Sequence, residues 1–185
     1  AVLAHEIGHH IYVPGNLTDN ARMLAALRRV LKGLREDTPH FVANLYGDLL
    51  INDLLQRQAN VDIAGVYRLL KTGAPAGEPT RVWKVYTRAY EHLWRLAPGT
   101  LAPPRVTEEM NGDAKLIAEL IRHFAGDWLR GAARFACILF PYLREDEAKN
   151  GAQTFVRVGL EDTKGAGRGV NGADAEAVPD GLTRI

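Results

Sequence analysis

The sequence predicts a mostly α-helical domain with little or no β-sheet, followed by a flexible C-terminal tail. Large apolar side chains recur at three- and four-residue spacing through most of the chain as far as residue 143. Prolines and Pro-Gly pairs separate these stretches, as they do at helix ends and in loops. From residue 159 on, glycine, alanine and acidic residues largely replace the apolar ones. We therefore divide the chain into a helical domain over residues 1–158 and a tail or linker over residues 159–185.

The predicted helices follow one another along the chain, separated by start and stop signals. Pro14-Gly15 ends the first helix, Thr18 or Asp19 caps the second, and Pro141 predicts a kink or a stop in the last. The helices are predicted over residues 1–13, 18–35, 38–58, 61–71, 81–97, 107–124 and 128–143. Residues 155–158 are predicted to form a short strand.

Composition and charge describe an ordinary globular protein, with 46% hydrophobic residues, 24% charged residues and a net charge of +1. A charge this small gives no basis for binding nucleic acid, and the basic row from Arg22 to Arg35 is interpreted as a solvent-exposed helix face. No apolar run approaches the ~18 residues of a membrane span, and no signal-peptide pattern is present. The single cysteine, Cys137, is predicted to be a buried packing residue. It fits a reducing compartment, so we expect a cytoplasmic protein without a membrane partner.

A metal-binding motif lies near the start of the sequence. The run His5-Glu6-Ile7-Gly8-His9 has the form H-E-x-x-H. Residues four apart on a helix differ by about 40° around its axis, so both imidazoles leave from one face and can reach one Zn²⁺. Glu6 lies at the edge of that face, where its carboxylate can act as general base on a water activated by the metal. His10 points away and is interpreted as structural.

A catalytic zinc site needs a third protein ligand and an open position for water. The metzincin continuation of the motif would place Gly at position 12 and His at position 15. This chain has Tyr12 and Gly15 there, so the third ligand must come from a later helix. The candidates on later helices are Asp48, Asp53, Glu91, Glu119, His40, His92 and His123.

A polar row on the third predicted helix singles out one of these candidates. Asn44, Asp48 and Asn52 follow one another at four-residue spacing within an apolar face. Buried polar groups are costly without partners, which a metal and its surrounding hydrogen bonds would supply. We predict Asp48 as the third ligand, with Asn52 orienting Asp48 or a ligand histidine; the alternative is a hydrogen-bonded core network without a metal. Asp53 is predicted to form a solvent-exposed ion pair with Arg57.

His40 follows Pro39 in a first turn and has no setting comparable to that of Asp48. The other four candidates are predicted to lie at boundary positions between the apolar and the polar face of their helices. These are Glu91, Glu119, His92 and His123. A tyrosine could stabilise the oxyanion, but the sequence gives no reason to prefer one candidate over another. The candidates are Tyr12, Tyr46, Tyr86 and Tyr90.

The H-E-x-x-H run, followed by the segment from Asn44 to Asp53, resembles zincin-type metallopeptidases over residues 1–58. More narrowly, it is similar to bacterial metallopeptidase domains that often precede a VWA-like domain. In these domains the motif is followed on a later helix by an Asp and, four residues on, an Asn, as Asp48 and Asn52 are here. The resemblance implies a zincin-like helical core with the motif helix at its N-terminus, Zn²⁺ as cofactor, and a peptide or protein substrate.

The sequence therefore predicts a zinc metallopeptidase in which His5, His9 and Asp48 hold the metal and Glu6 is the general base. The alternative is a non-catalytic zinc-binding interaction module, in which four protein ligands would close the site. Because the motif begins at residue 5, we expect the chain to be a fragment or a processed product that lacks an N-terminal segment or a partner domain.

Overall fold

The computed structural model describes residues 2–72 and 78–150, and every regular element within these ranges is an α-helix. The prediction of a mostly α-helical chain is confirmed. The strand predicted at 155–158 and the tail over 159–185 lie outside the described residues. The helices are α1 (Val2–Ile11), α2 (Leu17–Val30), α3 (Thr38–Gln58), α4 (Ile63–Thr72), α5 (Arg81–Trp94), α6 (Glu108–His123) and α7 (Trp128–Asn150).

Local contacts explain two of the helix ends that differ from the prediction. α2 begins after Asn16 rather than at a cap formed by Thr18 or Asp19, because the side-chain oxygen of Asn16 accepts the backbone N–H of Asp19 at 2.9 Å. α5 ends at Trp94, earlier than predicted, because Arg95 adopts a left-handed conformation with φ 55°.

α7 continues through Pro141 to Asn150, so of the predicted kink or stop at this proline the stop is wrong, and the helix extends beyond its predicted end at residue 143. Proline removes a single helical hydrogen bond, and Pro141 is exposed, so water can bind the carbonyl that the missing N–H leaves free. Beyond it, buried Asp146 accepts two backbone N–H groups in the first turn of α5, at 3.0 and 2.9 Å. Cys137, one turn before Pro141, is exposed as well, so its predicted burial is wrong.

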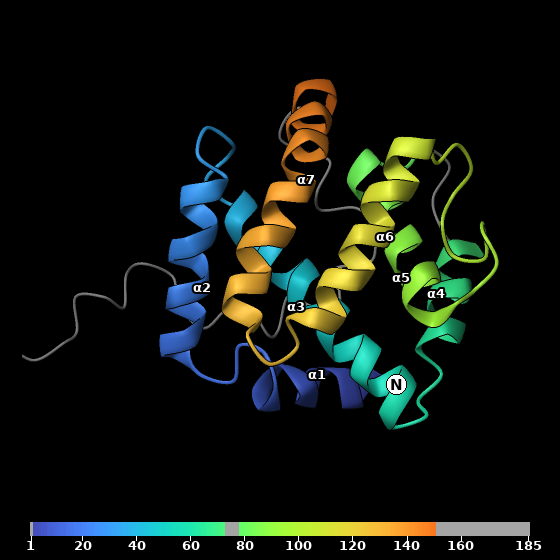
Figure 1. Cartoon of the computed structure of the whole chain (residues 1–185), viewed down its shortest axis with the longest axis horizontal. Helices are drawn as coiled ribbons and strands as arrows, with labels where there is room; N and C mark the ends of the chain where they lie inside the picture. The colour runs from blue at the N-terminus through green and yellow to red at the C-terminus, as the bar shows by residue number, and fades with distance from the viewer. Residues whose placement is uncertain (1, 73–77, 151–185) are drawn as a thin grey trace, which may run out of the picture.

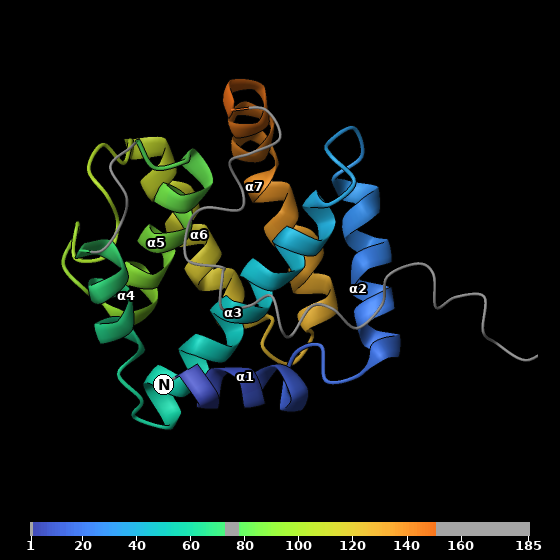
Figure 2. The ribbon, with the colours of Figure 1, turned by 180° about the vertical axis from the view of Figure 1, so that it is seen from behind.

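α3 is the central helix of the fold. It contacts α1, α2, α4, α5 and α7, and most of its residues are buried. Figures 1 and 2 show α2 on one side of α3 and α4 and α5 on the other, while α7 crosses α3 in both views. α1 runs across the lower end of this arrangement, crosswise to α2, and packs chiefly against α3. One face of α1 therefore presents its side chains directly to α3.

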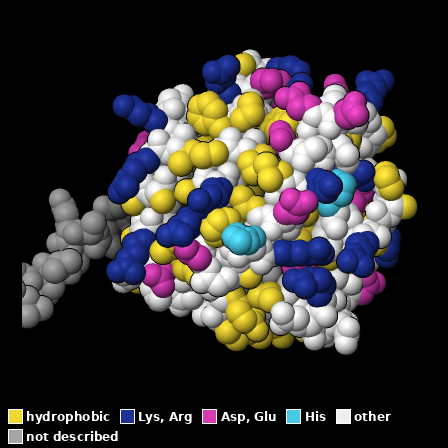
Figure 3. Space-filling model, viewed as in Figure 1, with side chains coloured by type: hydrophobic (Ala, Val, Ile, Leu, Met, Phe, Trp, Pro, Cys, Tyr) yellow, Lys and Arg dark blue, Asp and Glu magenta, His cyan; other side chains and the backbone are white. Residues whose placement is uncertain are grey.

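The surface carries the basic row of α2, as predicted. Figure 3 shows Lys and Arg side chains along the edge formed by this helix, with Asp and Glu side chains among them. Arg22, Arg28 and Arg29 on α2 are exposed, as is Lys32 just beyond it, whereas Arg35, the last member of the predicted row, is half-buried. Within the described residues, no helix combines the length and the apolar character needed to cross a bilayer.

Candidate metal centre

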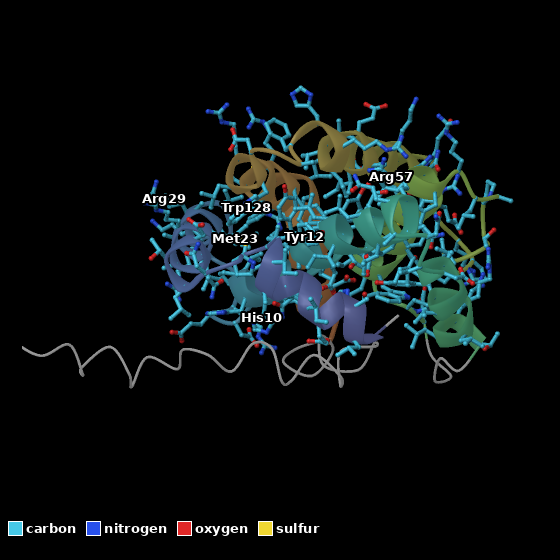
Figure 4. The ribbon with its side chains drawn as sticks, turned by 90° about the horizontal axis from the view of Figure 1, so that it is seen from below. His10, Tyr12, Met23, Arg29, Arg57 and Trp128 are labelled. Carbon is cyan, nitrogen blue, oxygen red and sulfur yellow. The ribbon has the colours of Figure 1, made fainter. Side chains whose placement is uncertain are left out.

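The close approach of α1 to α3 depends on Gly8. A Cβ atom at this position would overlap the Cγ2 methyl group of Ile51, a fully buried residue of α3. Glycine therefore lets the two helices pack more closely than any other residue would. Gly8 lies between His5 and His9 in the sequence, so both imidazoles are brought to α3. His10 on α1 and Tyr12 just beyond its end are exposed, by contrast, as Figure 4 shows from below.

His5, His9 and Asp48 meet where α1 crosses α3. Nε2 of His9 lies 3.2 Å from Nε2 of His5 and 3.1 Å from Oδ1 of Asp48, and 3.3 Å separates Nε2 of His5 from the same oxygen. Asp48 is buried and the two histidines are half-buried. The structure thus brings together the three side chains that the sequence predicts as ligands.

The outer nitrogen of each imidazole faces a carbonyl oxygen. Nδ1 of His5 lies 2.8 Å from Oδ1 of Asn52, and Nδ1 of His9 lies 3.2 Å from the backbone carbonyl of Val13. A carbonyl oxygen accepts and cannot donate, so each Nδ1 carries a proton. In a neutral imidazole whose Nδ1 is protonated, Nε2 carries a lone pair. In the neutral forms of both rings, this lone pair is directed at Asp48. This is the pattern in which a second partner fixes the tautomer of a metal-binding histidine.

The contact of Asn52 with a histidine of the group was predicted from the sequence, whereas the contact of Val13 with His9 was not. α1 ends at Ile11, and the chain turns at Pro14, so the carbonyl of Val13 is not used by the helix. The signal for it in the sequence is the helix stop that Pro14-Gly15 provides shortly after His9. A carbonyl beyond a helix end is free to accept from a side chain in the last turn.

The separations within this group fit a tetrahedral metal ion. Bonds of about 2.0–2.1 Å to zinc place neighbouring ligand atoms about 3.3 Å apart in a tetrahedral site. The observed separations run from 3.1 to 3.3 Å. Among the described residues, one group of His, Cys, Asp or Glu side chains has its ligand atoms close enough together to hold a single ion. It consists of His5, His9 and Asp48. Two imidazole nitrogens and a carboxylate oxygen are donors that zinc accepts.

The electrostatics of the group favour a positive charge at its centre. Burial raises the pKa of Asp48, but hydrogen bonds and charge from His5 and His9 outweigh burial and hold that pKa below its usual value. Burial lowers the pKa of His5, yet the hydrogen bond to Asp48 and its negative charge raise it overall. Asp48 therefore stays ionised near neutral pH while His5 tends to keep a proton. A metal ion competes with that proton for the same lone pair.

Glu6 lies beside the group without being one of its ligands. It follows His5 on α1, is half-buried, and is close enough for its charge to contribute to the raised pKa of the His5 imidazole. Within the described part of the chain, no hydrogen bond or ion pair restrains its carboxylate, so it can accept a proton from a water bound next to His5 and His9.

The other members of the polar row on α3 differ from one another. Asn52 joins the group through His5, whereas Asn44 is half-buried and forms no hydrogen bond with it among the described residues. Asp53 pairs with Arg57, as predicted. The predicted solvent exposure of this ion pair is wrong for its acidic partner, because Asp53 is only 2% exposed. Both oxygens of its carboxylate accept from Arg57, and Asp53 does not belong to the group of His5, His9 and Asp48.

The remaining candidates from the sequence lie apart from this group. Glu91 is buried, contrary to the predicted boundary position, because its carboxylate accepts the backbone N–H groups of Leu101 and Ala102 and pairs with Arg88. His92 is half-buried, and its Nε2 lies 3.0 Å from the side-chain oxygen of Asn111. The exposed candidates are His40, Glu119 and His123.

Replacing Gly8 by Ala is expected to separate α1 from α3 and to weaken zinc binding. Ile51 is fully buried and branched at Cβ, so its methyl group cannot move aside, and His5 and His9 would be displaced from Asp48. Gly47→Ala is the matched control, because an added Cβ there would lie 3.4 Å from Cε1 of His9, an ordinary contact. Zinc titration of both variants checks the expectation, and equal zinc affinity in the two would contradict it.

His5, His9 and Asp48, with Glu6 beside them, form the candidate metal centre of this protein. Its donors come from two helices that are far apart in the sequence and are brought together only by folding. No protein-family model, no curated protein and no solved structure matches this chain.

Proposed function

We propose that this protein is a zinc-dependent metallopeptidase in which His5, His9 and Asp48 hold Zn²⁺ and Glu6 is the general base. The observation that carries the proposal is the convergence of two Nε2 atoms and a carboxylate oxygen of buried Asp48 at 3.1–3.3 Å, the spacing of tetrahedral zinc ligands. The position of Glu6 in an H-E-x-x-H helix supports hydrolysis over simple metal storage, because it supplies a proton acceptor next to the metal.

The number of protein donors also supports a catalytic site. A structural zinc usually has four protein ligands, whereas a catalytic zinc has three and leaves one position for water. Three side chains form the group within the described residues. Asn52 and the carbonyl of Val13 hold the outer nitrogens of the two histidines, which keeps the rings from rotating.

When bound, Zn²⁺ lowers the pKa of a water in its open position to about 7 and polarises the substrate carbonyl. Glu6 would take a proton from a water held beside His5 and His9, which would leave the oxygen of that water able to attack the carbonyl carbon of the peptide. The same carboxyl group then gives the proton to the leaving amine as the C–N bond breaks. His5 and His9 keep their orientation, because Asn52 on α3 and the carbonyl of Val13, just beyond α1, hold their outer nitrogens.

Zinc removal and restoration test the proposal. The zinc-loaded chain is expected to cleave a fluorescently labelled casein, the chelator-treated chain is expected to be inactive, and one equivalent of zinc is expected to restore cleavage. Dialysis against a chelator, without heating, removes the zinc. Metal analysis then confirms the zinc content of the loaded, chelator-treated and restored samples. Zinc binding at the group without hydrolysis of casein or of a peptide library would contradict the peptidase and support a non-catalytic zinc-binding module instead.

Zinc is also expected to stabilise the fold. A ligand at about 100 times its Kd that binds only the native state adds about 2.7 kcal/mol to the free energy of unfolding. Thermal unfolding of the chelator-treated chain with and without zinc measures this change. Magnesium is the control, since it prefers sites made of oxygen ligands and is expected to leave the unfolding temperature unchanged. The same shift with both metals would indicate a site other than His5, His9 and Asp48.

A further inference from the structure

A buried group of hydroxyls lies behind the metal-binding group, on the far side of Asn52. The amide nitrogen of Asn52 lies 2.8 Å from the hydroxyl of Tyr90 and 3.5 Å from that of Tyr67. The hydroxyl of Tyr67 lies 3.2 Å from that of Tyr90, which in turn lies 3.0 Å from that of Tyr86. Tyr90 is thus the hydroxyl in contact with all the others.

The donors and acceptors of this group can be assigned. The amide nitrogen of Asn52 donates to Tyr90, so its carbonyl oxygen faces His5. Tyr67 donates its proton to Tyr90 as well, which occupies both lone pairs of the Tyr90 oxygen. The proton of Tyr90 is then directed to the oxygen of Tyr86. The 3.5 Å separation from Tyr67 is too long for a good hydrogen bond, so Tyr90 is the main partner of the Asn52 amide.

The orientation of the Asn52 amide decides which nitrogen of His5 is protonated. With the carbonyl oxygen toward His5, Nδ1 carries the proton and Nε2 is free to bind a metal. An amide turned by about 180° would present its NH₂ group instead, which requires a lone pair on Nδ1 and moves the proton of the neutral ring to Nε2. That tautomer cannot bind zinc through Nε2.

We propose that Tyr90 is a positioning residue, which holds the Asn52 amide in the orientation that keeps Nε2 of His5 free for zinc. This inference rests on the proposed zinc site. Tyr90 is itself fixed, since it is fully buried and its ring packs 4.7 Å from that of Tyr67 and 4.5 Å from that of Trp94. Burial raises its pKa well above the usual value, so its hydroxyl remains protonated.

Tyr90→Phe tests the proposal, with Tyr86→Phe as the matched control. Both changes remove one buried hydroxyl from the same helix, but only Tyr90 contacts Asn52. Competition with a zinc chelator measures affinity, and the visible spectrum of the cobalt-loaded chain reports the geometry of the ligands. Tyr90→Phe is expected to lower zinc affinity about 10-fold, the effect of losing an outer partner of a metal-binding histidine. Tyr86→Phe is expected to lower only the unfolding temperature.

An Asn52→Asp background separates positioning from a general loss of stability. Both oxygens of a carboxylate accept hydrogen bonds, so His5 keeps an acceptor however the side chain is turned. Adding Tyr90→Phe to Asn52→Asp is therefore expected to leave zinc affinity and the cobalt spectrum unchanged, although stability still falls. An equal loss of affinity in both backgrounds would show that Tyr90 acts only through stability.

The outcomes distinguish this inference from the function on which it rests. A wild-type chain that binds zinc, together with Tyr90→Phe and Tyr86→Phe variants of equal affinity, overturns the role of Tyr90 and leaves the zinc site intact. A wild-type chain that binds no zinc overturns both proposals. Zinc binding that weakens in Tyr90→Phe, is insensitive to Tyr86→Phe and recovers in the Asn52→Asp background supports the positioning role, whether or not the chain hydrolyses peptides.

Discussion

Replacing Glu6 by Gln is expected to reduce peptide hydrolysis by about 10²- to 10⁴-fold, the contribution of a positioned general base. The amide has the shape of the carboxylate but cannot take a proton from water. Zinc content is expected to stay at one ion per chain, because Glu6 lies beside the metal-binding group and is not one of its members. Rates with labelled casein and metal analysis of the same samples measure both quantities.

Glu119→Gln is the control for that experiment, since Glu119 is an exposed carboxylate on α6, which is not one of the helices that form the site. Its activity and zinc content are expected to equal those of the wild type. Full activity in Glu6→Gln would show that another group takes the proton. Loss of zinc in Glu6→Gln would show instead that Glu6 is a ligand, which would change the arrangement proposed for the site.

Replacing Asp48 by Ala is expected to lower zinc affinity by about 100-fold or more, because loss of an outer partner alone costs about 10- to 100-fold and Asp48 is a proposed ligand. The change also removes the negative charge that raises the pKa of His5. The two imidazoles would then hold zinc through two nitrogens only. Chelator competition gives the affinity, and unfolding curves without zinc show whether the variant is folded.

Asp53→Ala is the matched control, because Asp53 is a second buried carboxylate on α3 but pairs with Arg57. This variant is expected to lose some stability and to bind zinc as the wild type does. Equal zinc occupancy in Asp48→Ala and Asp53→Ala would show that the carboxylate of Asp48 is not a ligand. An equal loss in both would point to a general effect of disturbing α3.

The helices were predictable because their signals are local. Apolar spacing, prolines and capping residues act within one or two turns, so the order of the seven helices within the described residues follows from the sequence. The meeting of His5, His9 and Asp48 could also be predicted, since all three lie on helix faces whose direction the spacing defines. The strength of that prediction came from the cost of placing Asp48 and Asn52 in an apolar face.

Other features that depend on tertiary contacts could not be predicted. Glu91 looked like a boundary residue on its own helix, and its burial depends on loop amides at Leu101 and Ala102 that fold against it. Tyr90 appeared as one aromatic residue among several, and only the packing of α5 against α3 places its hydroxyl on Asn52. For Glu91 and Tyr90, the local pattern of the sequence did not indicate which distant groups each side chain would contact.

Anomalous diffraction at the zinc edge, from crystals of the zinc-loaded chain, tests the central claim most directly. We expect one strong peak about 2.0–2.2 Å from Nε2 of His5, Nε2 of His9 and a carboxylate oxygen of Asp48, with water in the fourth position and Glu6 beside it. A peak elsewhere, the absence of a peak between these side chains, or a fourth protein side chain that closes the site would contradict it.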